Sequence, residues 1–255
     1  MRGTEALLTM LEERGVDTIF GYPGGSVLSI YNELLDSDIR HVLVRHEQCA
    51  AHMADGYARA KNVPGVCLAT SGPGTTNLVT GIATAYADSV PLIALTGQVA
   101  AGSLGQGAFQ EVDAYSLLMP ITKHSYRVLD VNRLPHAISE AWDICQMGRK
   151  GPVHIDMPVD QMGKDLPEAL IHEPYGVKPL TEDLTGVHEA VQWIRECERP
   201  LILVGGGAMD ASEEVMELAK LTGAPVVNTL MGMGIVPSSY PMNMGPLGLH
   251  GRLAA

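Results

Sequence analysis

Short runs of consecutive apolar residues alternate with helix-like stretches along the first two-thirds of the chain, and this alternation constrains the fold most. The runs expected to form strands are residues 18–20, 40–44, 65–70, 91–96 and 153–157. The stretches expected to form helices are residues 4–14, 27–35, 47–60, 75–88 and 135–147. Strands that are apolar on both faces are typical of a parallel sheet with helices on each side. The sequence therefore predicts an α/β fold in which a parallel sheet is flanked by helices.

This alternation stops and resumes around one irregular segment. Residues 163–186 contain three prolines, mixed charges and weak periodicity, which is typical of a linker. We therefore expect a first domain at 1–162, a linker at 163–186 and a second domain at 187–255. The second stretch repeats helix and strand patterns but is small for a sheet covered on both faces. It predicts part of a Rossmann-like α/β domain.

Charge and composition exclude several classes of partner. The chain has 255 residues, and 17 lysines and arginines against 29 aspartates and glutamates give a formal net charge of −12. A chain this acidic has no overall attraction to nucleic acids or anionic membranes. No apolar run reaches the roughly 18 residues of a membrane span, and acidic residues near the N-terminus disfavour a targeting peptide. We therefore expect a cytoplasmic protein that binds neither nucleic acid nor a membrane.

Cysteines and histidines show no spacing typical of a metal site. The four cysteines lie far apart in the sequence, which is typical of reduced thiols in a cytosolic protein and not of a disulfide framework. His52 follows His46 by six positions, whereas a zinc-binding HExxH helix needs four. No metal ligand is therefore predicted within these residues.

Four glycine-rich or polar segments lie where chemistry is expected in a parallel sheet. They are residues 21–25, 45–48, 70–74 and 105–113. Ligands bind such sheets at the carboxyl ends of the strands, and glycine lets the backbone approach a ligand closely. Taken alone, Glu47 is explained by stabilisation of a helix N-terminus, and Gln110 by an ordinary surface amide. Because all four segments should lie along one edge of one sheet, we predict a ligand site there.

Several blocks of sequence match one enzyme family. They are FGYPGG (20–25), RHEQ (45–48), TSGPGTTNLVTGIATAYADS (70–89), LTGQV (95–99) and AFQEVD (108–113). With these blocks the chain resembles the large catalytic subunit of acetohydroxyacid synthase, also called acetolactate synthase, which depends on thiamine diphosphate. RHEQ with TSGPG is typical of the wider thiamine-diphosphate group, whereas GYPGG with AFQE is much more specific. The resemblance is strong from about residue 5 to residue 158 and looser up to residue 250.

The resemblance implies roles for individual residues. Glu47 matches the glutamate that hydrogen-bonds N1′ of the cofactor's aminopyrimidine, and Gly25 matches the glycine whose backbone approaches the 4′-amino group. Phe109 and Gln110 match the pair beside the reacting carbon and the substrate. Glu47, Gly25 and Gln110 are therefore the expected catalytic residues. The residues that match the lining of the pyrimidine are Tyr22, Thr70, Pro73 and Asn77.

The resemblance also implies FAD and Mg²⁺ as cofactors. Arg149 matches an arginine that contacts FAD. The positions that match flavin-contacting stretches are Gly205, Gly206, Gly207, Thr229, Leu230 and His250. The family binds Mg²⁺ and the cofactor's diphosphate through a GDG motif and a distant asparagine in a third domain, and this sequence has no GDG. We therefore expect the Mg²⁺ site in a C-terminal domain that this sequence lacks.

Three positions depart from the family pattern near the substrate channel. Ala100 replaces a proline, Gly107 stands where aspartate is usual, and Val159 replaces a lysine. Phe109, Ala100 and Val159 are the residues expected along that channel. The departures bear on substrate choice more than on use of the cofactor.

The implied reaction decarboxylates pyruvate on thiamine diphosphate and transfers the two-carbon unit to a second 2-oxoacid. That acceptor is pyruvate or 2-oxobutyrate, and the products feed branched-chain amino-acid biosynthesis. A homodimer or tetramer is implied, with a regulatory small subunit as a further partner.

Two alternatives stay open. One is another thiamine-diphosphate enzyme, such as sulfoacetaldehyde acetyltransferase or a 2-oxoacid decarboxylase. The other is a catalytically inactive fragment or scaffold half without the domain for the diphosphate and Mg²⁺. We expect the 255-residue chain alone to be inactive.

Overall fold

The chain folds into two compact units. The computed structural model describes residues 1–178, 183–249 and 251–252. The first unit comprises Met1–Leu180 and the second Thr181–Ala255. Each unit contains its own parallel sheet.

The first unit is built on a six-stranded sheet. Its strands are β1 (Thr18–Gly21), β2 (Arg40–Leu43), β3 (Gly65–Ala69), β4 (Leu92–Gln98), β5 (His124–Arg127) and β6 (Pro152–Pro158). The spatial order is β2-β1-β3-β4-β6-β5, and every neighbouring pair is parallel. Every residue of β3, β4 and β6 is buried, as the continuous apolar runs indicate. The predicted parallel sheet is confirmed.

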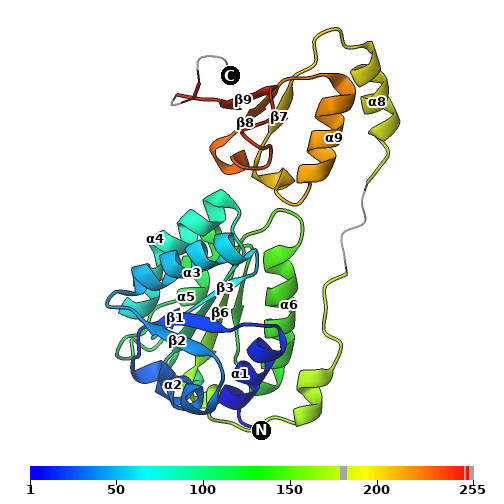
Figure 1. Ribbon diagram of the computed structural model, residues 1–255. Coiled ribbons are helices and arrows are strands. Elements are labelled where there is room, and N and C mark those ends of the chain that lie inside the picture. Colours follow the sequence, from blue (N-terminus) through cyan, green and yellow to red (C-terminus); the bar gives the residue numbers. More distant parts are fainter. Residues whose placement is uncertain (179–182, 250, 253–255) are drawn as a thin grey trace. The chain divides into compact units, whose positions relative to one another are not determined.

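Helices cover both faces of this sheet (Figure 1). One apolar core joins the sheet to α1 (Gly3–Glu13), α2 (Leu28–Glu33) and α6 (Leu134–Gln146). The other core joins it to α3 (Glu47–Lys61), α4 (Pro73–Asp88) and α5 (Ala114–Leu118). Successive residues of one strand serve opposite cores: Leu68 belongs to the first and Cys67 to the second. The expected helix-flanked sheet is therefore present.

The structure differs from the sequence expectations in two places. The single helix expected at 27–35 is a short α2 between two 3₁₀ turns, Gly25–Val27 and Leu34–Asp36. Strand β5 was not expected, because its residues HSYR are polar and its edge position buries only Ser125 fully. A strand that pairs on one side only does not need an apolar run.

The first part of the expected linker packs against the first unit. Leu166 and Ile171 are buried in the same core as α1 and α6, and Arg2 forms a β-bridge with Asp165. A short 3₁₀ segment, Glu168–His172, and the four-residue helix α7 (Val159–Met162) belong to this region. The chain thus stays in contact with the first unit well beyond residue 162.

The second unit is smaller. Its elements are α8 (Val187–Glu196), β7 (Ile202–Val204), α9 (Ser212–Thr222), β8 (Val226–Asn228) and β9 (Asn243–Pro246). The strands form a parallel sheet in the order β7-β8-β9. The unit buries one small core, to which Val204, Ala219 and Val226 contribute. A second, smaller parallel α/β unit is therefore present, as expected, with β9 as a strand that the sequence pattern did not indicate.

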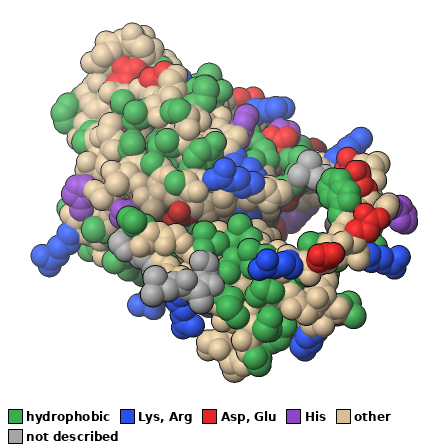
Figure 2. Space-filling view, turned by 90° about the horizontal axis from the view of Figure 1, so that it is seen from above, with side chains coloured by type: hydrophobic (Ala, Val, Ile, Leu, Met, Phe, Trp, Pro, Cys, Tyr) green, Lys and Arg blue, Asp and Glu red, His purple; other side chains and the backbone are tan. Residues whose placement is uncertain are grey.

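Two further observations concern membrane-spanning helices and the distribution of charge on the surface. No helix in the part of the chain that the structure describes is both long and apolar enough to cross a membrane. On the face drawn in Figure 2, lysine and arginine side chains are scattered between acidic and apolar ones rather than gathered in one patch.

Candidate functional site

The topology of the first sheet places a switch point at its carboxyl edge, where a crevice is expected. β1 pairs with both β2 and β3, so the chain leaves β1 towards one side of the sheet and β3 towards the other. Such a switch point opens a crevice at the carboxyl ends of parallel strands. The turns after β1, β2 and β3 all begin at this edge.

A serine joins the turn after β1 to the turn after β3. Ser26 Oγ lies 2.9 Å from Thr70 Oγ1 and accepts a hydrogen bond of 2.9 Å from the Ser71 amide. Gly24 makes the contact possible, because a Cβ there would lie only 2.5 Å from Thr70 Cβ. Sequence reasoning missed Ser26, which carries no signal beyond being a small polar residue after two glycines.

Glu47 lies in the first turn of α3 and is held by α4. Its Oε2 accepts a hydrogen bond of 2.9 Å from Asn77 Nδ2. The helix begins there because His46, its N-cap, accepts the Gln48 amide through Nδ1 at 3.1 Å. Glu47 is half-buried, and its Oε1 lies beside Gly74 in the turn after β3, where an added Cβ would be 3.5 Å away, an ordinary contact distance. The structure therefore brings the predicted pair Glu47 and Asn77 together.

The backbone of Gln110 lies at the same edge of the sheet. Its φ of +58° is left-handed, and its carbonyl lies over Gly72, where an added Cβ would be 2.5 Å from that oxygen. Gly72 also has a positive φ of 58°. Non-glycine residues in such conformations persist only where surrounding contacts hold them, and they cluster at functional sites. The 105–113 loop, hereafter the Gln110 loop, thus meets the turn after β3.

Glu111 folds the Gln110 loop around its own carboxylate. It accepts the amides of Gly105 and, at 3.0 Å, Ala108. These backbone hydrogen bonds, the Gly105 one first, lower the pKa of Glu111 below its ordinary value. Sequence reasoning missed this role.

A buried polar cluster lies beneath the loop. Asp156, on β6, is fully buried and accepts from Thr96 Oγ1 at 3.0 Å and from Arg127 Nε at 3.1 Å. Burial raises the pKa of Asp156, while hydrogen bonds from Gln98, Thr96 and Arg127 oppose that shift. Burial also lowers the pKa of His154 to about 3. The available signal for this cluster was a histidine and an aspartate inside an otherwise apolar strand.

The remaining predicted residues of the first unit divide into two groups. Tyr22 and Pro73 are exposed at the carboxyl edge, and Phe109 is 87% exposed at the tip of the Gln110 loop. Ala100 and Val159 follow β4 and β6, whose ends are joined by a hydrogen bond of 2.8 Å from the Ala101 amide to Asp160. All of these lie at the predicted edge.

Arg149 does not lie at the carboxyl edge with these residues. It lies before β6, at the amino edge of the sheet, where its guanidinium donates to Ser89 Oγ at 2.7 Å and to the Ala87 carbonyl at 3.1 Å. These bonds complete the C-terminus of α4. The structure thus gives Arg149 a structural task in this unit.

The predicted residues of the second unit lie together at the carboxyl edge of its own sheet. Gly205, Gly206 and Gly207 follow β7, and Thr229 and Leu230 follow β8. The Thr229 amide donates to the Val204 carbonyl at 2.9 Å, and its Oγ1 accepts the Gly232 amide at 3.1 Å. His250 lies outside the described residues.

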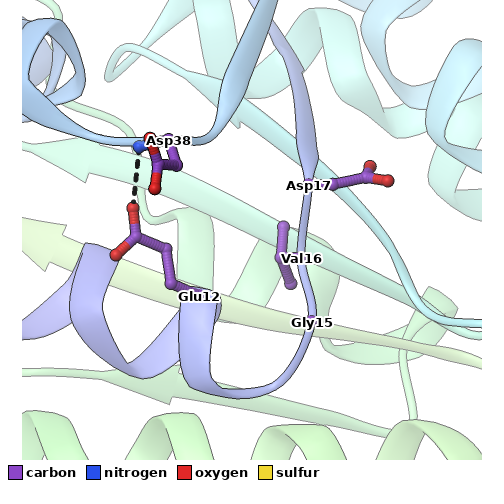
Figure 3. Close-up of a pocket in the computed structure, with 5 residues that line it drawn as sticks. All are labelled: Glu12, Gly15, Val16, Asp17 and Asp38. Carbon is purple, nitrogen blue, oxygen red and sulfur yellow. Dashed lines mark hydrogen bonds between the residues drawn. The ribbon is translucent and has the colours of Figure 1, made fainter.

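A surface pocket of about 290 Å³ lies at the amino edge of the first sheet (Figure 3). It is lined by Glu12, Gly15, Val16, Asp17 and Asp38. Glu12 accepts the Asp38 amide at 3.1 Å, the bond drawn in Figure 3. The pocket is therefore at the opposite end of the strands from Glu47. Among the described residues no group of three or more histidine, cysteine, aspartate or glutamate side chains is placed to hold a metal ion.

Comparison with known proteins covers both units. Residues 1–117 match the family described as thiamine pyrophosphate enzyme, N-terminal TPP binding domain, and residues 187–255 match its central domain. The chain is 49% identical over 269 residues to a probable acetolactate synthase large subunit of Methanocaldococcus jannaschii. It is 47% identical over 262 residues to the acetolactate synthase large subunit of Corynebacterium glutamicum, and 43% over 258 residues to the isozyme 1 large subunit of Escherichia coli.

These matches cover a much larger share of this chain than of its relatives. They cover 100%, 100% and 98% of this chain, but 44%, 42% and 45% of the three relatives. The chain therefore spans less than half the length of the curated relatives it matches.

Proposed function

The chain belongs to the thiamine pyrophosphate enzyme family, and from this premise we propose that its first unit binds the aminopyrimidine ring of thiamine diphosphate for an acetolactate synthase reaction. The observation that carries the proposal is the Glu47 carboxylate, fixed by Asn77 at the edge where all four predicted segments meet. The proposed reaction joins two pyruvate molecules, or pyruvate and 2-oxobutyrate, with release of CO₂.

The residues present fit an aminopyrimidine. Asn77 occupies Oε2 of Glu47, and within the described residues Oε1 accepts no hydrogen bond, which leaves it for a ring nitrogen. A side chain on Gly25 would meet no described neighbour within 4 Å, so the backbone there is open to a ligand. Thr70 is buried and held by Ser26, which makes that wall of the crevice rigid.

Each residue then has a defined task. When bound, thiamine diphosphate supplies the carbon nucleophile that permits decarboxylation and carries the two-carbon unit. Glu47 shares a proton with N1′ of the pyrimidine, and Asn77 keeps the carboxylate in place for that transfer. The Gly25 backbone orients the 4′-amino group, and Tyr22 and Pro73 border the ring. Phe109 and Gln110 border the 2-oxoacid, with Ala100 and Val159 along its approach.

Further parts of the proposal concern cofactors and assembly. We assign FAD to the second unit, where backbone amides after β7 and β8 lie together beside Thr229; Arg149 and His250 are the other proposed contacts. Mg²⁺ and the diphosphate are assigned to a domain outside these 255 residues. A homodimer or tetramer, a regulatory small subunit, a cytoplasmic location and a place in branched-chain amino-acid biosynthesis complete the proposal.

A chimeric enzyme tests the reaction. Residues 1–255 would replace the matching N-terminal region of the Methanocaldococcus jannaschii relative, and acetolactate formed from pyruvate would be measured with thiamine diphosphate and Mg²⁺ present. We expect product from the chimera and none from the 255-residue chain alone. A folded chimera that binds the cofactor but makes no acetolactate would contradict the proposal.

The same assay separates the alternatives. Acetaldehyde as the sole product from pyruvate would identify a 2-oxoacid decarboxylase. Turnover of sulfoacetaldehyde without turnover of pyruvate would identify a sulfoacetaldehyde acetyltransferase. Both alternatives take their support from the 105–113 loop and from Val159 in place of the family's lysine.

A further inference from the structure

Two polar side chains of the sheet reach from the buried Asp156 to the Gln110 loop. Gln98 Nε2 donates to Asp156 Oδ2 at 3.2 Å and to the Val112 carbonyl at 2.9 Å. Arg127 donates through Nε to Asp156 and through Nη2 to Asp113. Both connections end on the two residues that follow Glu111. The stem of the loop is therefore tied to β4, β5 and β6 at adjacent positions.

Stabilising the buried Asp156 carboxylate does not by itself require the hydrogen bonds to Val112 and Asp113. A buried carboxylate is costly unless charge and hydrogen bonds compensate it, and Asp156 has 0% exposure. Thr96 and Arg127 already supply such partners from within the sheet. The bonds to Val112 and Asp113 add nothing to the solvation of Asp156, but they fix where the loop leaves the sheet.

In the part of the chain that the structure describes, the loop has no comparable anchor at its tip. Phe109 is 87% exposed, and the bonds of Glu111 to Gly105 and Ala108 remain inside the loop. Within the described residues, Gln110 is held by the contact of its backbone with Gly72 and by the stem two residues later. A shift of the stem would consequently move Gln110 away from the turn after β3.

We propose that Gln98, Arg127 and Asp156 form a positioning network that sets the place of Gln110 beside the crevice. The inference rests on the proposed function for the part that Gln110 plays towards a 2-oxoacid. The network itself is a property of the chain and can be measured without any cofactor.

Amide hydrogen exchange of the purified chain tests the network. The variants are Gln98→Met, which keeps the size of the side chain but removes its donor, and Arg127→Lys, which keeps a positive charge beside Asp156 but loses the fork that reaches Asp113. We expect the amides of Gly105, Ala108 and Glu111 to exchange about tenfold faster in both variants.

Ser125→Ala is the matched control. Ser125 is buried and hydrogen-bonds His154 Nδ1 at 2.7 Å on the same strands, but no bond connects it to the loop among the described residues. Exchange is compared under conditions that give all variants equal free energies of unfolding. Loop exchange in Arg127→Lys that rises no more than in Ser125→Ala would overturn the inference. This comparison decides the matter even if Gln98→Met fails to fold.

A second readout separates this inference from the proposed function. In the chimeric enzyme, Arg127→Lys should raise KM for pyruvate about tenfold while leaving the Kd of thiamine diphosphate unchanged. Faster loop exchange with an unchanged KM would remove Gln110 from the proposed substrate site while leaving the network established. An unchanged rate of loop exchange would refute the network, whatever the chimera does.

Discussion

The two units of the chain each contain a parallel sheet, but the two sheets are covered to different extents. In the first, a parallel sheet is covered by helices on both faces, and two apolar cores result. In the second, a three-stranded sheet buries one small core, α8 has no buried residue, and Leu203, in β7, is 59% exposed. A parallel strand is apolar on both sides and is stable only when both sides are covered. Stability should therefore be concentrated in the first unit.

Their carboxyl edges differ as well. The first edge places an ionisable side chain, Glu47, against glycine turns that are held by side-chain hydrogen bonds. The second edge places glycines beside a neutral threonine. The first is suited to moving a proton, the second to contacting a ligand through backbone groups.

Removing the carboxylate should have the largest effect. Glu47→Gln keeps the size of the side chain but cannot share a proton, so acetolactate formation by the chimera should fall about 10²–10⁴-fold. Thr229→Val, at the edge of the second unit, should reduce retained flavin instead. Initial rates and flavin absorbance measure the two effects. Turnover that survives in Glu47→Gln would remove Glu47 from its proposed role.

Core truncation tests where stability lies. Leu95→Ala, in the fully buried strand β4, should cost about 2–5 kcal/mol of unfolding free energy. Leu203→Ala should cost less than about 1 kcal/mol, because its side chain is mostly solvated. Hydrogen exchange during urea unfolding reports on each unit separately. Equal losses would mean that Leu203 is covered in solution.

Glycine substitution compares the turns at the two edges. Gly72→Ala should destabilise the first unit by about 1–3 kcal/mol, because of its positive φ and its contact with the Gln110 carbonyl. Gly207→Ala should stay within about 0.5 kcal/mol, since a Cβ there meets no described atom within 4 Å. Chemical denaturation measures both. A neutral Gly72→Ala would show that the Gln110 loop moves aside freely.

Acidification should weaken the first unit through His154. Unfolded, its imidazole binds a proton near the ordinary pKa of 6.5, whereas the folded chain keeps it neutral down to about pH 3. The unfolded state therefore binds more protons between these values, and the free energy of unfolding falls by at most ~1.4 kcal/mol per pH unit as the pH decreases.

A neighbouring group opposes this trend. The raised pKa of Asp156 favours the folded state at the acidic end, because the folded chain then binds that proton more tightly. His154→Gln should flatten the dependence of unfolding free energy on pH, whereas His188→Gln, on the exposed α8, should not. An unchanged slope in His154→Gln would contradict the burial of a neutral imidazole.

Sequence reasoning succeeded where local pattern and burial agree. The apolar strands β3, β4 and β6 were expected nearly at their observed bounds, because each must be covered on both faces. It failed at β5 and β9, whose short sequences contain no apolar run and become strands only by pairing with a neighbour already in place. Glu47, Asn77 and Gln110 could be singled out from their motifs. Ser26 and Asp156 could not, since their importance lies in contacts with distant residues. Glu111 could not either, because its role depends on how the loop folds around its carboxylate.

The sequence alone determined the order of the helices and of every strand except β5 and β9, the parallel sheet and the four turns that meet at its edge. These follow from periodicity, glycine positions and the direction of parallel strands. Only the tertiary structure decided which side chains meet there. Ser26 contacts Thr70 across 44 positions, and Asp156 lies 58 positions from Gln98. A hydrogen bond depends on where two atoms lie in space, and only the packed sheet brings residues so far apart in the chain within reach.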